Sequence, residues 1–377
     1  AEDTGTGSAE DTGTGSARDT GTSDLNGDSI AAQIATKLGR PARFLVGLGN
    51  VSYTNSWSDS PVFGLPVTLD FHYEYLVGLP GEGGWTEWND NGRYPIYIAE
   101  ADIANGVIPM VTVYQMAAWG DGNTDVLDDP EYMTGYWDAA KILMERYGND
   151  IDGHPAVVHV EPDFWGYIHF ESNGNPASMP AILHPECAHL PDDVTGIGKC
   201  WVYLARTYAP NVIIGLHASE WGIDAEDMAN TLLACGGGEA DVVFREFLDR
   251  DAGCFEAGVL PQCQRNGEFY LDETNQTSPN FREHLEWTKT LSTVMEKPVM
   301  WWQVPLGVPS DTPGGTPGHY RDNRVKYIFD HPDEFVAAGG LGVCFGTGAS
   351  GQTTIESDGG QFATAVTGYF ANPTPLP

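Results

Sequence analysis

Apolar residues in this chain fall into short runs, separated by stretches in which they recur at helical spacing. Several runs, such as VIPMV, AVVHV and ADVVF, are almost continuously apolar, which is typical of parallel strands buried on both faces. We predict eight strands, at residues 43–51, 67–77, 107–116, 156–163, 212–217, 241–247, 299–304 and 342–347. Amphipathic stretches predict helices at residues 132–147, 199–208, 226–234, 281–294 and 323–338.

This alternation of strands and helices predicts an α/β protein with a (β/α)8 barrel, forming a single catalytic domain over residues 30–377. A doubly wound open sheet is the alternative, but such a sheet more often has a Gly-rich phosphate loop after its first strand. The first predicted strand carries Gly47 and Gly49 but lacks both the third glycine and a following helix. The barrel is therefore the favoured architecture.

The first 29 residues consist largely of an octad, AEDTGTGS, AEDTGTGS, ARDTGTSD, with no large apolar side chain before Leu25. Such Gly/Ser/Thr tracts form flexible tethers, so we predict a disordered low-complexity linker at residues 1–29. A tether of this kind suggests a secreted or cell-surface, lipoprotein-like protein, although a plain disordered tail would have the same composition.

The charge balance is strongly acidic, with 53 Asp and Glu against 18 Lys and Arg and a net charge of −35. This sign argues against a nucleic-acid partner. The content of hydrophobic residues, 41%, excludes a disordered acidic chain, and no apolar run approaches the roughly 20 residues of a membrane span. Only 6 of the basic residues are Lys, and an acid-rich, Lys-poor surface predicts a protein adapted to high salt.

The six cysteines include no CxxC pair, so the sequence offers no support for a zinc ribbon or a thioredoxin-type site. Cys187 with Cys200, and Cys254 with Cys263, bracket predicted loops and suit local disulfides in an oxidising compartment. The other two cysteines, at a helix end and within a strand, are expected to be buried thiols.

Functional side chains of a parallel barrel project from the carboxyl ends of its strands. Polar residues gather near six of the predicted strand ends, and these are Asp70, His72, Glu74, Gln115, His159, Glu161, Asp163, His217, Glu220, Glu246, Asp249, Asp251 and Gln303. Charged residues inside strands are costly unless they are paired or functional. We expect these side chains to converge on an active site, with an internal hydrogen-bonded network as the alternative.

Aromatic residues crowd the same strand ends, and we predict that Trp119, Trp165, Trp221 and Trp302 bind substrate. Indole and phenol rings stack on the apolar faces of sugars, whereas core packing is the alternative for each ring alone. A carboxylate-rich cleft walled by such rings predicts a polysaccharide or oligosaccharide substrate. No cofactor is expected.

Glycoside cleavage requires two carboxyl groups, one protonated to assist the leaving oxygen and one ionised. We predict Asp163 as the general acid and Glu161 as its partner or the modulator of its pKa, because neighbouring carboxylates resist ionising together. Glu220, Asp251 and Asp70 are the candidates for the second carboxylate, and the sequence does not decide among them.

The EPD of VVHVEPDFWG resembles the strand-four signature of family 6 glycoside hydrolases, and residues 248–254 resemble the DRDC segment of that family. The resemblance implies a distorted barrel with Asp163 as the catalytic acid, although the two segments here stand in the reverse order. Retaining barrel glycosidases carry Glu at the ends of strands four and seven. Here strand seven ends in Gln303, which favours inversion or a different acid.

Two other functions fit the same residues. A metal-dependent hydrolase could use His72, His159 and His217 with Asp70 or Glu161 as ligands, and a non-catalytic barrel could bind sugar without cleaving it. A structural Ca²⁺ is a further possibility at residues 121–125 and 249–251, although DGNTD lacks the later bidentate Glu of an EF-hand.

Overall fold

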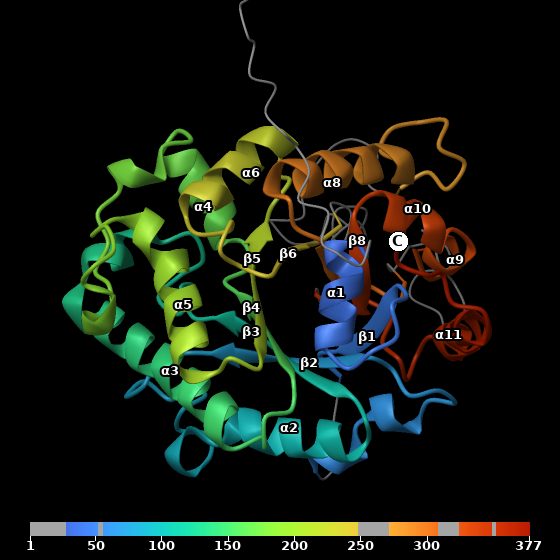
Figure 1. Cartoon of the computed structure of the whole chain (residues 1–377), viewed down its shortest axis with the longest axis horizontal. Helices are drawn as coiled ribbons and strands as arrows, with labels where there is room; N and C mark the ends of the chain where they lie inside the picture. Colours follow the sequence, from blue (N-terminus) through green and yellow to red (C-terminus); the bar gives the residue numbers. More distant parts are fainter. Residues whose placement is uncertain (1–27, 52–55, 248–270, 308–323, 349–351) are drawn as a thin grey trace, which may run out of the picture.

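The computed structural model describes residues 28–51, 56–247, 271–307, 324–348 and 352–377. Eight parallel strands form a closed barrel in sequence order, with β8 pairing with β1 (Figure 1). The strands are β1 Leu45–Gly49, β2 Phe71–Val77, β3 Ile108–Tyr114, β4 Ala156–Val160, β5 Val212–Ala218, β6 Val242–Arg245, β7 Val299–Val304 and β8 Gly340–Phe345. All eight predicted strands are confirmed, with ends that differ by a few residues.

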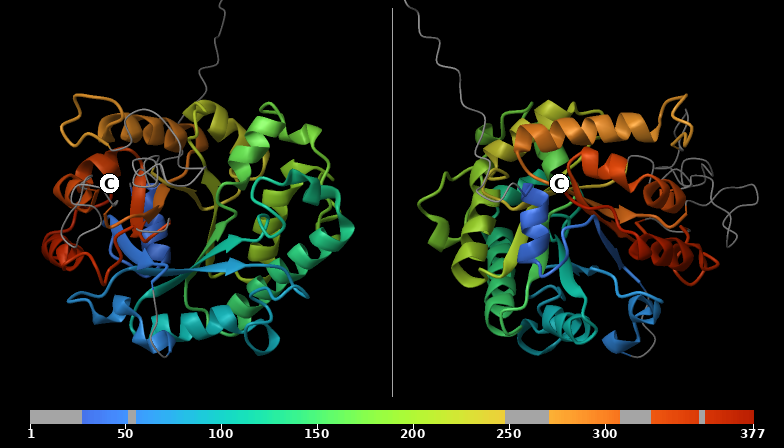
Figure 2. Two further views of the ribbon diagram at one scale, coloured as in Figure 1. Left: turned by 180° about the vertical axis from the view of Figure 1, so that it is seen from behind. Right: turned by 45° about the vertical axis from the view of Figure 1, so that its right-hand side comes forward.

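Helices surround the barrel on its outside (Figures 1 and 2). They are α1 Ile30–Lys37, α2 Tyr94–Ala104, α3 Pro130–Asn149, α4 Phe164–Glu171, α5 Val194–Tyr208, α6 Ala225–Ala234, α8 Phe281–Met295, α9 Arg324–Asp330, α10 Pro332–Ala337 and α11 Gln361–Ala371. The helix predicted at residues 323–338 is two helices, and residue 323 lies outside the described residues. Pro332 separates them because it disfavours helical geometry at His331 and opens α10 at its first turn.

Local capping explains where the long helix α3 begins. The Asp129 carboxylate accepts hydrogen bonds from the backbone N–H groups of Glu131 and Tyr132, at 2.9 and 3.0 Å, and Pro130 occupies the first helical position, where no N–H is needed. The buried side of α3 then packs on the outer face of the strands, where Tyr136 joins a core cluster with Val158.

The barrel interior changes in character along its axis. At the amino ends of the strands it is filled by aliphatic and aromatic side chains, including Leu45, Phe71 and Ile213. Gly47 on β1 makes room for this layer, because a Cβ there would lie 2.8 Å from the Cβ of Phe71. Towards the carboxyl ends the inward positions become polar or aromatic. On β5, for example, His217 lies four residues after Ile213 and on the same face of the strand.

The amino end of the barrel is closed by α1. Ser29 caps this helix through a 3.2 Å hydrogen bond from Ala32, and α1 residues such as Ala35 pack with Leu45 and with Leu376 near the carboxyl terminus. The opposite end, where the carboxyl ends of the strands lie, is where barrel enzymes place their functional side chains.

The disulfide predicted between Cys187 and Cys200 is confirmed. Cys235 and Cys344 are buried free thiols, as expected. The pair Cys254 and Cys263 lies outside the described residues. None of the described helices combines the length and the apolar character that a membrane crossing requires.

Candidate active site at the carboxyl end of the barrel

Four interior side chains from neighbouring strands form a continuous hydrogen-bonded chain. The Thr112 hydroxyl lies 3.3 Å from Nδ1 of His159, Nε2 of His159 lies 3.0 Å from Nδ1 of His217, and Nε2 of His217 is hydrogen-bonded to Oε2 of Glu246. All four residues are buried. Burial, and secondly the neighbouring His217, hold the pKa of His159 well below its usual value, so His159 is neutral at pH 7.

Aromatic rings enclose this chain. Trp302, inward-facing on β7, lies edge-on to His159 and His217, with ring centroids 4.8 and 5.6 Å apart, and also contacts Tyr75 at 5.8 Å. Phe244 stacks on His159 at 4.2 Å. The interior at this end therefore combines flat apolar faces with a buried carboxyl group.

Gln303 follows Trp302 at a distortion of β7, where the register with β8 shifts and the residue adopts a φ of 53°. Its side-chain amide donates a hydrogen bond to the Tyr75 hydroxyl across the barrel. Gly348 stands opposite, and a Cβ there would lie 2.4 Å from the Gln303 side-chain oxygen in this arrangement. Gln303 is thus held at the barrel end.

Asp163 lies at the same end, at the turn from β4 into α4. It has a φ of 69° and is 8% exposed. Its charge acts on Tyr114 of β3, whose pKa is raised by burial first and then by the charges of Asp163 and Asp121. Gly166 lets α4 approach the loop that carries Trp221, because a Cβ there would lie 2.9 Å from the indole.

Glu161 does not face the barrel interior. Its carboxylate accepts hydrogen bonds from the backbone N–H groups of Gln115, at 3.1 and 3.2 Å, and of Met116, at 3.1 Å, and it lies near Tyr136 of α3. Burial raises the pKa of Glu161 to about 8, and these hydrogen bonds oppose the rise. Glu161 therefore ties the ends of β3 and β4 together, so the expectation that it faces the mouth beside Asp163 is wrong.

His72 and Glu74 of β2 face the helices, and Asp70 immediately precedes the strand, so the expectation that these three side chains converge on an active site is wrong. Phe71 and Tyr73, which alternate with them, belong to the interior core. Asp70 accepts from Arg43 at 2.7 and 2.9 Å near the amino end. His72 pairs through Nδ1 with Asp102 of α2, at 2.7 Å, and lies 3.5 Å from Glu74.

Glu220 forms an ion pair with a buried arginine. Its Oε2 lies 2.6 Å from Nη2 of Arg245, whose guanidinium also donates to Thr288 at 2.6 Å and covers the ring of Trp287. Burial raises the pKa of Glu220 and Arg245 opposes that rise. Sequence reasoning missed Arg245, although a lone arginine within an apolar strand was a signal that a buried partner exists.

The other predicted binding residues are dispersed. Trp119 is 42% exposed and donates from Nε1 to Glu82 at 2.8 Å, so its ring is held at the surface. Trp165 is buried in the helix layer and donates to a backbone carbonyl, and Gln115 donates to the carbonyl of Gly78. Trp221 is half-buried beside Tyr167. Asp249 and Asp251 lie outside the described residues.

The described residues include no three His, Cys, Asp or Glu side chains grouped as metal ligands. The three histidines of the metal hypothesis are also separated, because His72 faces α2 whereas His159 and His217 face the barrel interior. In the loop at residues 121–125, Asn123 caps the following turn through its side chain.

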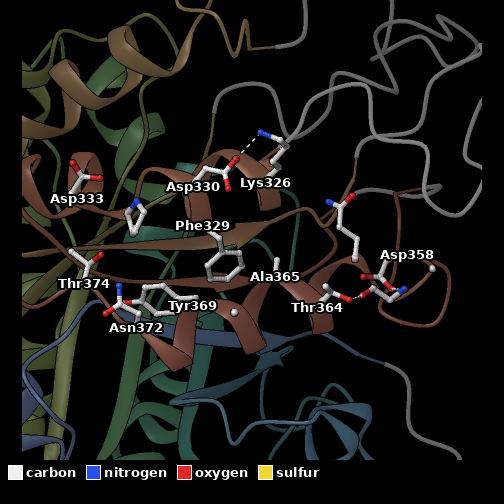
Figure 3. Close-up of a pocket in the computed structure, with 15 residues that line it drawn as sticks. Lys326, Phe329, Asp330, Asp333, Asp358, Thr364, Ala365, Tyr369, Asn372 and Thr374 are labelled. Carbon is white, nitrogen blue, oxygen red and sulfur yellow. Dashed lines mark hydrogen bonds and ion pairs between the residues drawn. The ribbon is translucent and has the colours of Figure 1, made fainter.

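A separate cavity of about 840 Å³ lies on the outside of the barrel between α9, α10 and α11 (Figure 3). Several of its polar groups are already bonded within the protein. Lys326 bonds to Asp330 at 2.6 Å, Asp358 accepts two backbone N–H bonds at the start of α11, and the Tyr369 hydroxyl donates to the carbonyl of Phe44. The carboxyl end of the barrel is therefore the better candidate site.

No known protein-family profile matches the chain, and no curated protein matches it either. Solved structures share its fold. A GH26 protein from Muricauda sp. is 11% identical with a TM-score of 0.53, covering 91% of this chain and 89% of its own. A GH26 β-mannanase from Bacteroides ovatus is 11% identical with a TM-score of 0.50, covering 91% and 92%.

A GH5 xyloglucan-specific β-1,4-glucanase from a ruminal metagenomic library is 12% identical with a TM-score of 0.52, and the match covers 93% of this chain and 94% of that one. At such identities the likeness establishes the fold. The expected resemblance to barrel glycoside hydrolases is thus confirmed in architecture, along almost the whole chain.

Proposed function

We propose that this protein is a glycoside hydrolase that acts on a polysaccharide or oligosaccharide at the carboxyl end of the barrel. The observation that carries the proposal is a pair of carboxyl groups, Asp163 after β4 and Glu246 after β6, at the same end of one barrel. Both residues are buried, and the aromatic rings of Trp302 on β7 and Tyr75 on β2 are in contact with each other at 5.8 Å. Two carboxyl groups and flat apolar faces are what glycoside cleavage requires.

The surroundings of the two carboxyl groups support different roles. Glu246 accepts a hydrogen bond from His217, which favours an ionised carboxylate for attack on the anomeric carbon or activation of water. Asp163 remains the general acid. Of the earlier candidates for the second carboxylate, Asp70 lies near the amino end and Glu220 is paired with Arg245, so Glu246 takes this role among the described residues.

The substrates to test first are β-linked polysaccharides, because two structural neighbours are named as a β-mannanase and a β-1,4-glucanase. We also propose secretion or attachment to the cell surface, which the disulfide between Cys187 and Cys200 supports.

The decisive experiment compares Asp163→Asn and Glu246→Gln with the wild-type protein on soluble mannan, xyloglucan and β-glucan, by release of reducing ends. Each substitution should lower kcat by about 10² to 10⁴ and retain glycan affinity, because a positioned proton-transfer group contributes about that much. Asp224→Asn is the matched control, since Asp224 also precedes a helix without a side-chain cap, and it should leave kcat unchanged.

Two outcomes would contradict the proposal. Unchanged turnover in both variants would exclude this carboxyl pair, and no reducing ends from any glycan with the wild-type protein would exclude the activity. If the wild-type protein does release reducing ends, NMR of the first-formed anomer would distinguish inversion from retention.

A further inference from the structure

The hydrogen-bonded chain behind Glu246 has a direction that follows from the protonation states of its members. A carboxylate only accepts hydrogen bonds, so with Glu246 ionised Nε2 of His217 must donate. When Nδ1 of His217 accepts in the same chain, Nε2 of His159 must donate to it. His159 in turn accepts at Nδ1, and among the described residues the Thr112 hydroxyl is the donor that reaches this nitrogen.

Every bond of the chain is satisfied in this arrangement, in which each imidazole donates from Nε2 and accepts at Nδ1, and Glu246 carries the charge. His159 is neutral because it is fully buried and faces another imidazole. Phe244 and Trp302 cover the chain from β6 and β7, so water does not replace these bonds readily. The Thr112 hydroxyl thus fixes the tautomer of His159, and His159 fixes that of His217.

We propose that His217 is the positioning residue of Glu246, and that His159 and Thr112 hold His217 in the tautomer that donates to the carboxylate. The chain keeps Glu246 ionised and oriented for its role in glycoside cleavage, so this inference rests on the proposed function. All three act through Glu246.

Other charges near Glu246 set the background against which the chain acts. Arg245, the last residue of β6, and Glu220, which follows β5, both interact with the charge of Glu246. These two neighbours form an ion pair with each other at 2.6 Å, so their effects on Glu246 partly cancel. The His217 hydrogen bond to Glu246 acts against this background.

The test measures the pKa of Glu246 directly, by ¹³C NMR titration of protein labelled at the glutamate carboxyl carbon and assigned with Glu246→Gln. His217→Phe removes the donor, and the pKa of Glu246 should rise by about one to two units, because a hydrogen bond to a charged group is worth that much. His159→Phe keeps a ring stacked on Phe244 but removes the hydrogen bond to Nδ1 of His217, so His217 is no longer held in one tautomer. A smaller rise in the pKa of Glu246 is expected.

The matched control is His169→Phe. His169 is also bonded to a threonine hydroxyl, with Nδ1 2.8 Å from Oγ1 of Thr231, but it lies on α4 outside the barrel interior. This variant should leave the pKa of Glu246 unchanged. His217→Gln retains an amide donor and should show a smaller rise than His217→Phe, and with His159→Phe it decides the question if His217→Phe does not fold.

The NMR readout separates this inference from the proposed function. An unchanged pKa in the folded His217 and His159 variants overturns the positioning role, even if turnover falls. A raised pKa in a protein that hydrolyses no glycan supports the chain and refutes the glycosidase. In an active enzyme, the limb of the pH profile of kcat/KM that reports Glu246 should move to higher pH in step with the NMR value.

Discussion

Glu161 and Asp163 stand two residues apart, yet their carboxyl groups have different surroundings. Glu161 is fully buried against backbone N–H groups of the β3 end, whereas Asp163 opens α4. Both residues adopt a positive φ, 51° for Glu161 and 69° for Asp163. A strand that kept its regular geometry would have placed both side chains on one face, which was the basis of the sequence prediction.

The buried Glu161 carboxyl makes stability depend on pH. Its pKa rises from an ordinary 4.5 to about 8 in the folded protein, so between these values the folded state holds a proton that the unfolded state has lost. Stability therefore falls as pH rises through this window, by about 1.4 kcal/mol per pH unit. Glu161→Gln should remove this contribution, so its stability should fall less steeply with pH than that of the wild-type protein, as measured by urea unfolding of both proteins from pH 5 to pH 8.

The comparison needs a carboxyl group without such an environment. Glu226→Gln, at an exposed position in the first turn of α6, should preserve the wild-type slope of stability against pH. If the unfolding free energies of the wild-type protein and Glu161→Gln change in parallel from pH 5 to pH 8, Glu161 ionises in the folded state at its ordinary pKa.

Residue types at the strand ends predicted part of the site. His159, His217, Glu246 and Trp302 were named from the sequence, and the structure brings them together. Strand alternation places each of them on one face of its strand. It does not predict the hydrogen bonds among them, because these depend on the spacing of different strands.

At the scale of elements, β2 shows why alternation alone can mislead. Both faces of a barrel strand are buried, so a polar alternate face can point to the helices as well as to the interior. The sequence offers Phe71 and Tyr73 on one face and His72 and Glu74 on the other. The aromatic face fills the barrel, because Asp102 of α2 supplies a buried partner for His72 outside it.

The contact between β2 and α2 should contribute strongly to stability. Burial alone would lower the pKa of His72, but Asp102 and Glu74 outweigh it and raise that pKa to about 10, so the pair is charged. Asp102→Asn leaves this imidazolium without its nearest carboxylate and should cost about 3 kcal/mol of unfolding free energy. Turnover at the distant barrel mouth should be retained.

Glu100 provides the control on the same helix. It pairs with Arg93 at 3.1 Å, but its side chain is 55% exposed. Glu100→Gln should therefore change stability by less than about 0.5 kcal/mol. Equal losses in the two variants would mean that the buried pair contributes no more than a surface pair.

At the scale of the whole molecule, the fold was predictable because eight apolar runs alternate with amphipathic segments, and a closed barrel buries them all. The acidity belongs to the barrel domain. Seven acids and one arginine fall within residues 1–29, which leaves a net charge of −29 for the remainder. Few of these charges are needed inside, so most of them repel one another at the surface.

This repulsion predicts that salt stabilises the protein. The Debye length falls from about 30 Å at 0.01 M to about 3 Å at 1 M salt, so the destabilising field of the acidic surface is progressively screened. The melting temperature should rise with NaCl over this range, by at least about 2 °C, which corresponds to roughly 1 kcal/mol for a chain of this size. KCl should act equally, because screening depends on ionic strength, whereas sucrose at matched osmolality should not reproduce the low-salt part of the rise. A melting temperature that stays flat to 1 M salt would mean that the acidic surface imposes no such cost.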